Sequence, residues 1–166
     1  MSKSSNENAS HTHSHDHDHS HGFDPTNMTV EEIVEQSLML LKEAGFKITN
    51  KRREIIEIFA ENQNYQTAKF VHQTLSKKYP TMSYNTTYRN LYDFVEHGIL
   101  ESTEYNQEQL FRISCGTHHH HHFICTECGK TLPIHLCPMG AVESELKDVE
   151  IEEHRFEVFG KCSQCK

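Results

Sequence analysis

Two Cys-x-x-C pairs lie 33 residues apart near the C-terminus, one at Cys125 and Cys128 and the other at Cys162 and Cys165. Each such hairpin points two thiolates to one side, so two hairpins complete a tetrahedral shell for Zn²⁺. One pair alone would also be compatible with a redox motif. Because the chain has no recognisable secretory signal, two pairs favour a closed structural zinc site over disulfides.

A run of five histidines, residues 118–122, lies just before the first pair. If the run is extended, consecutive side chains point to opposite faces, so that one strand can serve two metal sites. His120 and His122 then share one face, and His119 and His121 share the other. On the first face a thiolate and a carboxylate complete a set that suits zinc. That set is Glu101, Cys115, His120 and His122.

The segment before these ligands has the pattern of a winged helix-turn-helix. Apolar residues recur at three- and four-residue steps, and the sequence predicts helices that begin after Thr29, Thr49, Thr67 and Ser83. Gly45 is expected to end the first helix, and Gly98 the fourth. The runs "ILESTEY" and "QLFRISC", separated by "NQE", predict a β-hairpin.

Beyond Cys115 the pattern changes to short strands and one short helix. "HHHHFIC", "TLPI" and "EIEEHRFEVFGKC" are expected to be strands, and "GAVESELKDV" a helix. A domain this small buries little apolar surface as a monomer, so we expect it to dimerise.

Charge is unevenly distributed along a chain whose formal net charge is −8. Residues 45–92 contain eight Lys and Arg side chains against three carboxylates, which is an electrostatic footprint for phosphate, although an ordinary solvated helical surface would also fit. The outer face of the fourth predicted helix carries side chains suited to base edges and phosphates, where the alternative is a plain amphipathic helix. These side chains are Asn85, Tyr88, Arg89 and Tyr92.

Residues 1–27 are polar and place a histidine at every second position from 11 to 21. Such a segment is predicted to be a disordered tail, which is either a weak metal buffer or delivery arm, or dispensable. No apolar run approaches the ~18 residues of a membrane span, so we expect a cytoplasmic protein without a membrane partner.

The motifs "SYNTTYRNL", "THHHHHFICTECGK" and "HRFEVFGKCSQC" occur in an order that resembles the ferric uptake regulator family, most closely its zinc uptake regulator branch. The resemblance runs from about Thr29 to Cys165. It implies an α+β fold with an N-terminal winged helix-turn-helix domain followed by a small C-terminal α/β dimerisation domain. It also implies that Tyr88 and Arg89 contact DNA.

The resemblance further implies three zinc sites per subunit. One is structural (Cys125, Cys128, Cys162 and Cys165), and one is sensory (Glu101, Cys115, His120 and His122). An additional site is formed by His119, His121 and His154, with an acidic ligand near Glu143. Tyr65 stands where other members use a histidine ligand. No role is assigned to His118, His135 or Cys137.

The sequence thus predicts a zinc-responsive transcriptional repressor, not an enzyme, that binds an AT-rich inverted repeat of double-stranded DNA as a homodimer and controls zinc-uptake genes. The expected parts are a tail (1–27), a DNA-binding domain (28–114) and a metal-binding dimerisation domain (115–166). Alternatives are a repressor of the same family that senses iron, manganese or peroxide, and a zinc store or metallochaperone.

Overall fold

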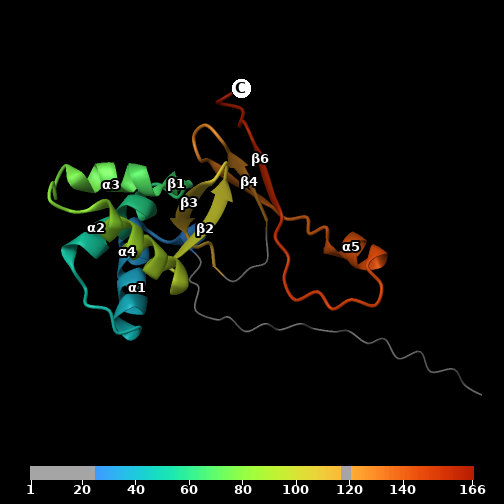
Figure 1. Ribbon diagram of the computed structural model, residues 1–166, viewed down its shortest axis with the longest axis horizontal. Helices are drawn as coiled ribbons and strands as arrows, with labels where there is room; N and C mark the ends of the chain where they lie inside the picture. The colour runs from blue at the N-terminus through green and yellow to red at the C-terminus, as the bar shows by residue number, and fades with distance from the viewer. Residues whose placement is uncertain (1–24, 117–120) are drawn as a thin grey trace, which may run out of the picture.

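The computed structural model describes residues 25–116 and 121–166. A helical group and a β-hairpin lie beside a second small sheet, from which residues 138–153, which include α5, project as an arm (Figure 1). The elements in chain order are η1 (Pro25–Asn27), α1 (Val30–Glu43), α2 (Asn50–Glu61), β1 (Gln66–Thr67), α3 (Ala68–Ser76), α4 (Tyr84–Glu96), β2 (Leu100–Tyr105), β3 (Glu108–Ile113), β4 (His121–Cys125), β5 (Thr131–Ile134), α5 (Met139–Glu145) and β6 (Glu157–Gly160).

The predicted tail lies outside the described residues, except for its end, where residues 25–27 form a single 3-10 turn. His118, His119 and His120 also lie outside them. No helix in the described ranges is long and apolar enough to cross a membrane.

The four long helices begin where hydroxyl side chains cap them. Thr29 accepts a hydrogen bond from the backbone of Glu32, whose carboxylate bonds back to Thr29, which completes the predicted capping box. The other caps are Thr49, Thr67 and Ser83. Gly45 and Gly98 adopt the positive φ that lets the chain leave α1 and α4. The four helices predicted in this segment are therefore confirmed, whereas the helix predicted over "GAVESELKDV" ends early, because α5 covers only Met139–Glu145.

The core lies in what we call the helical unit (residues 25–113). Phe59, Phe94 and Phe111 are fully buried there, on α2, α4 and β3. In the C-terminal unit (residues 121–166), by contrast, the only buried hydrophobic residues are Ile124, Cys125 and Cys162. So small a buried apolar surface stabilises a domain only weakly. This agrees with the expectation that the C-terminal unit needs a bound metal or a second copy of the chain for its stability.

The wing is a three-stranded antiparallel sheet in the order β1-β3-β2. Asn106 and Gln107 form its two-residue turn with φ of 51° and 64°, the positive values that keep a hairpin twisted correctly. The predicted hairpin is confirmed. Strand β1 was not expected, because two residues carry no periodicity.

The second sheet has the order β5-β4-β6, with β4 antiparallel to β5 and parallel to β6. The expectation of a strand throughout "EIEEHRFEVFGKC" was wrong in extent, because β6 covers only Glu157–Gly160. Those four residues pair with residues 122–125 of β4, and the chain before them returns from the arm without a strand partner among the described residues.

Contacts between side chains and backbone join the two units. The Tyr65 amide donates a hydrogen bond to the Gly129 carbonyl (3.0 Å). The Thr103 hydroxyl donates to the Glu157 carboxylate. Tyr105 stacks on Phe159 with ring centroids 4.8 Å apart. The wing is thus held against β6 and against the turn that follows β4.

A pair of glycine substitutions tests the first of these contacts. Gly45 (φ +83°) has nothing within 4 Å of an added Cβ, whereas a Cβ on Gly129 (φ +70°) would lie 2.2 Å from the Tyr65 carbonyl oxygen. We expect Gly45→Ala to lower the free energy of unfolding by ~1–2 kcal/mol, the cost of a left-handed alanine. Gly129→Ala should cost more, because the backbones must also separate. Urea unfolding measures both, and equal losses would contradict the contact.

Candidate metal centres and nucleic-acid interface

Side chains with metal-ligating atoms gather in three groups within the described part of the chain. In each group the ligand atoms all lie within 4.8 Å of one another. The groups are Cys125, Cys128, Cys162 and Cys165; Glu101, Cys115 and His122; and His121, Cys137 and His154. Strand β4 or the turn after it contributes to every one.

The four-thiol group forms because β4 and β6 run parallel and end together. Cys125 pairs with Gly160 in the β4–β6 register, which brings the turn after β4 beside the turn after β6. The Cys128 and Cys162 sulfurs are 3.8 Å apart, and the Cys162 amide donates to the Cys125 sulfur at 3.4 Å. None of the four is in a disulfide, and Cys125 and Cys162 are buried.

Backbone amides prepare this group for a cation. The Cys162 amide, followed by that of Cys128, lowers the pKa of Cys125 to about 6, so that its thiolate is already favoured near neutral pH. Cys165 shows the opposite shift, since its hydrogen bond with Cys162 raises its pKa to about 12. Four sulfurs, one of them prepared as a thiolate, fit a closed tetrahedral metal site.

The second group lies where the two units meet, and its three side chains come from separate elements. Glu101 is on β2, Cys115 follows β3, and His122 is on β4. The Cys115 thiol donates to Glu101 Oε2 at 3.2 Å and lies 3.7 Å from His122 Nε2. His122 Nδ1 is 3.9 Å from Glu101 Oε1. We call this the junction group.

Two neighbours hold the carboxylate of the junction group in place. The buried Tyr65 hydroxyl donates to Glu101 Oε1 at 3.1 Å. Arg112, opposite Glu101 in the hairpin register, has its Nε 3.5 Å from the same oxygen and its guanidinium over the Tyr65 ring. Glu101 Oε1 therefore contacts Tyr65 and Arg112 of the helical unit, while Oε2 accepts the hydrogen bond from Cys115.

The protonation of Cys115 follows from these surroundings. Burial, and then the negative charge of Glu101, raise its pKa to about 12, so that it is a thiol at neutral pH and donates its proton to the carboxylate. A metal ion bound by Cys115 must displace that proton. Metal binding at Cys115 would therefore replace its hydrogen bond to Glu101.

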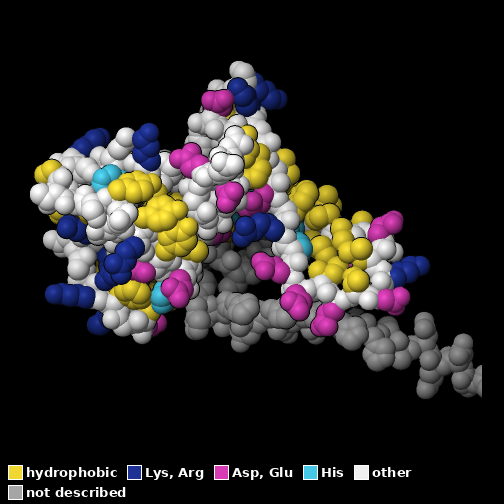
Figure 2. All heavy atoms as spheres, in the orientation of Figure 1, with side chains coloured by type: hydrophobic (Ala, Val, Ile, Leu, Met, Phe, Trp, Pro, Cys, Tyr) yellow, Lys and Arg dark blue, Asp and Glu magenta, His cyan; other side chains and the backbone are white. Residues whose placement is uncertain are grey.

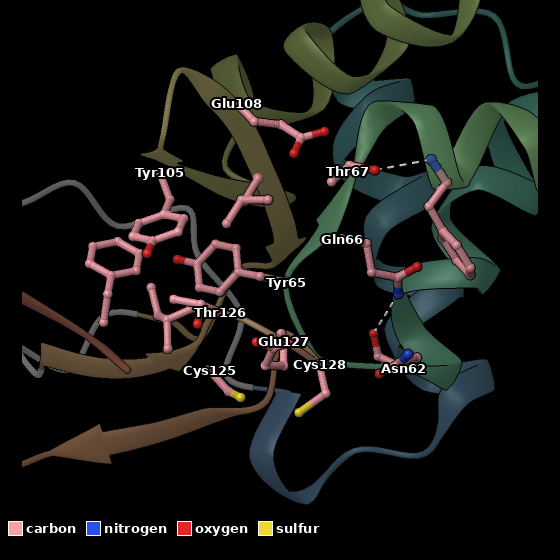
Figure 3. A pocket seen from close by; sticks show the side chains of 15 residues that line it. Asn62, Tyr65, Gln66, Thr67, Tyr105, Glu108, Cys125, Thr126, Glu127 and Cys128 are labelled. Carbon is pink, nitrogen blue, oxygen red and sulfur yellow. Dashed lines mark hydrogen bonds between the residues drawn. The ribbon is translucent and has the colours of Figure 1, made fainter. Parts of the chain in front are cut away.

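A cavity of about 310 Å³ separates the two units beside these groups. Figure 3 shows Tyr65 and Tyr105 on the wing side, with Cys125 and Cys128 on the side of the C-terminal unit. Because Tyr65 lines this cavity, bonds to Glu101 and donates its amide to Gly129, it connects the junction group to the turn that carries the four-thiol group.

The third group lies on the opposite face of β4 from His122. His121 is buried, and its ring centroid is 5.3 Å from that of His154. The Cys137 sulfur is 3.6 Å from His154 Nε2. The acid expected here, Glu143, lies on α5 with an exposed side chain and is not part of this group.

The structure brings together most of the ligand atoms that the sequence singled out. It assembles the four thiols, joins Glu101 to Cys115 and His122, and joins His121 to His154. His119 and His120 lie outside the described residues. Sequence reasoning did not place Cys137 in this group, because it belongs to no motif with metal-ligand spacing. The only signal in the sequence was that one cysteine of a chain rich in candidate metal ligands had no assigned role.

The outer face of α4 carries the side chains expected to meet DNA. Asn85, Arg89 and Tyr92 are exposed, and Tyr88 is half-buried. The Tyr88 and Tyr92 hydroxyls are 3.3 Å apart, and this hydrogen bond raises the pKa of Tyr88 to about 12. The Tyr88 hydroxyl therefore remains a neutral hydrogen-bonding group at physiological pH.

Part of the predicted basic block is already neutralised within the protein. Arg53 pairs with Glu31, Glu35 and Glu57, and Lys78 pairs with Glu54. Lys and Arg side chains are nevertheless spread over the helical unit, while acidic side chains gather over the wing and the arm (Figure 2). The positively charged surface available to DNA phosphates is therefore smaller than the number of Lys and Arg residues in the sequence predicts.

Comparisons with known proteins agree on one family. The model of the ferric uptake regulator family matches residues 43–159. The ferric uptake regulation protein of Staphylococcus epidermidis is 45% identical over 130 residues, which cover 78% of this chain and 94% of that protein.

Solved structures share the fold. The ferric uptake regulator of Francisella tularensis with iron has a TM-score of 0.58 at 25% identity, covering 73% of this chain and 95% of that one. A zinc uptake regulator complexed with zinc and DNA has a TM-score of 0.63 at 20% identity, covering 82% and 95%.

Replacing one sulfur tests the four-thiol group. We expect Cys165→Ser to lower the metal content of the purified chain by one ion, because a serine hydroxyl is a poor substitute for a thiolate. Ser163→Ala, an exposed position in the same turn, is the matched control. Elemental analysis measures both, and an unchanged metal content in Cys165→Ser would contradict the assignment.

Proposed function

Because the chain belongs to the ferric uptake regulator family, we propose that it is a zinc-responsive transcriptional repressor that binds operator DNA as a homodimer and controls zinc-uptake genes. Members of this family are metal-responsive DNA-binding regulators. The observation that carries the proposal is the junction group, in which Cys115 lies within reach of both Glu101 and His122. In our proposal residues 28–114 bind DNA and residues 115–166 dimerise.

The thiol in the junction group is the argument for zinc. Glu101, Cys115 and His122 provide one oxygen, one sulfur and one nitrogen, and His120 is our proposed fourth ligand. Thiolate with imidazole suits Zn²⁺, whereas Mn²⁺ and Fe²⁺ sites rely more on carboxylates and imidazoles. The four-thiol group is proposed as a structural zinc site, and its closed sulfur shell gives it no catalytic role.

Metal occupancy would act through the position of the wing. When bound, zinc supplies a cross-link among ligands from β2, the segment after β3, and β4. Tyr65 and Arg112 already fix the Glu101 carboxylate to the helical unit, so a change at Cys115 and His122 is transmitted to that unit. Zinc then favours one arrangement of the units only by its difference in affinity between arrangements.

DNA binding is assigned to α4. Its exposed Asn85, Arg89 and Tyr92 project into solvent beside Tyr88, as side chains that enter a major groove must. Two copies of this helix in a homodimer would meet successive major grooves of an inverted repeat, for which we propose an AT-rich sequence.

Iron sensing is the strongest alternative to zinc sensing, because the staphylococcal relative at 45% identity is named for ferric uptake. Manganese and peroxide sensing belong to the same alternative. A zinc store that does not bind DNA is a different alternative, and removal of residues 1–27 distinguishes it, since a repressor retains DNA binding without that segment.

The decisive experiment is a DNA-binding titration at buffered free Zn²⁺, Fe²⁺ and Mn²⁺, using fluorescence anisotropy of an AT-rich inverted repeat. We expect Zn²⁺ to tighten binding at the lowest free concentration, by about 5- to 150-fold, the usual range of allosteric coupling. Cys115→Ser should lose this response while retaining the weak binding seen without the metal.

Arg89→Ala is the complementary control, because it should weaken DNA binding at every zinc concentration and leave zinc binding unchanged. A zinc response that persists in Cys115→Ser would refute the junction assignment. A response to Fe²⁺ at lower free concentrations than Zn²⁺ would favour the iron alternative.

A further inference from the structure

We propose that Cys137 is a zinc ligand that, with His121 and His154, forms a Cys-His₂ site at the base of the arm (residues 138–153). The inference replaces the carboxylate expected from the sequence with a thiolate. It does not depend on DNA binding or on zinc sensing at the junction group, because none of these three side chains belongs to that group.

The three ligand atoms already converge. Cys137 Sγ lies 3.6 Å from His154 Nε2, and the His121 and His154 rings are 5.3 Å apart, with all three ligand atoms within 4.8 Å of one another. Phe156 meets the His121 ring edge-on at 5.3 Å, which limits its orientation. Ligand atoms this close to one another need little movement to bind one zinc ion.

The carboxylates of the arm do not compete for this position. Glu143 and Glu145 lie on α5, where every residue is at least partly exposed and none is buried. No carboxylate of the arm has an oxygen in the group, and this includes the four acids that follow α5: Asp148, Glu150, Glu152 and Glu153. One sulfur and two imidazoles are a donor set that prefers Zn²⁺ and Co²⁺ to harder ions, with the fourth position of a tetrahedral ion left to a further donor.

The location of the group suggests its purpose. Cys137 and His154 are the residues just before and just after the arm, so an ion held by both closes its base and, through His121, attaches that base to β4. The arm projects from the body with no buried residue in its helix (Figure 1). Closing a loop of this kind removes conformational entropy from the open chain.

The arm and the segment before it also expose a hydrophobic surface. Leu136, Leu146 and Val149 are 71%, 49% and 57% exposed, and Figure 2 shows hydrophobic side chains gathered over α5. An arm that carries such a surface packs on a partner more readily when its base is fixed, because less ordering entropy is then lost on association. If the chain forms the proposed homodimer, fixing the base of the arm would favour packing of this surface on the second copy.

Cobalt spectroscopy tests the thiolate directly. In full-length Cys115→Ser protein that retains one structural zinc per chain, we expect added Co²⁺ to bind with a thiolate-to-cobalt charge-transfer band. Adding Cys137→Ser should abolish that band and weaken Co²⁺ binding at least tenfold, the loss typical of a perturbed ligand shell. Glu143→Gln in the same background is the control and should leave band and affinity unchanged.

Retained structural zinc and an unchanged circular dichroism spectrum establish that each variant is folded. A charge-transfer band that survives Cys137→Ser would overturn the proposal. If Glu143→Gln loses cobalt binding while Cys137→Ser keeps it, the proposal is overturned and the Glu143 carboxylate is the ligand instead.

Tryptic cleavage at the exposed Lys147 reports whether the ion holds the arm. In the Cys115→Ser background we expect Zn²⁺ to slow this cleavage several-fold, and we expect the protection to be absent when Cys137→Ser is added. Equal cleavage with and without Zn²⁺ would contradict the clamp.

Discussion

The alternation of side chains along β4 decides which ligands meet in two of the three candidate metal groups. Because neighbouring residues of a strand face opposite ways, His122 joins Glu101 and Cys115 while His121 joins Cys137 and His154. The parallel pairing with β6 then brings Cys125 beside the second Cys-x-x-C turn. A shift of one residue in register would exchange the two histidines and dismantle both groups at once.

The junction between the units is polar and closely bonded. The Glu101 carboxylate accepts hydrogen bonds from the Tyr65 hydroxyl and the Cys115 thiol, and it forms an ion pair with Arg112. One carboxylate therefore contacts both the helical unit and the ligand group. The Tyr65 amide extends this network to Gly129. A change in protonation or metal ligation at Cys115 therefore alters the hydrogen bonds of groups that position the wing. In our proposal this is the physical basis for coupling metal binding to DNA binding.

Local chemistry made much of this fold predictable. Caps at Thr29 and Ser83 and glycines at 45 and 98 act within one turn of a helix, so their effect is legible from sequence. The two faces of the histidine run followed from the period of a strand. Cys137 could not be placed, because its approach to His154 depends on how the arm returns. The role of Tyr65 was also hidden, since its hydrogen bond to Glu101 spans 36 positions of the chain.

In our proposal, zinc at the junction group sets the position of the DNA-binding helices in the dimer. Electron paramagnetic resonance distances between spin labels at the exposed Glu96, at the end of α4, would measure it; the label requires a non-natural amino acid, because six cysteines are present. With the four-thiol group kept occupied by zinc, we expect a broad distance distribution that narrows to one separation as zinc fills the junction group, and we expect no narrowing in Cys115→Ser. A distribution that is the same with and without zinc would contradict it.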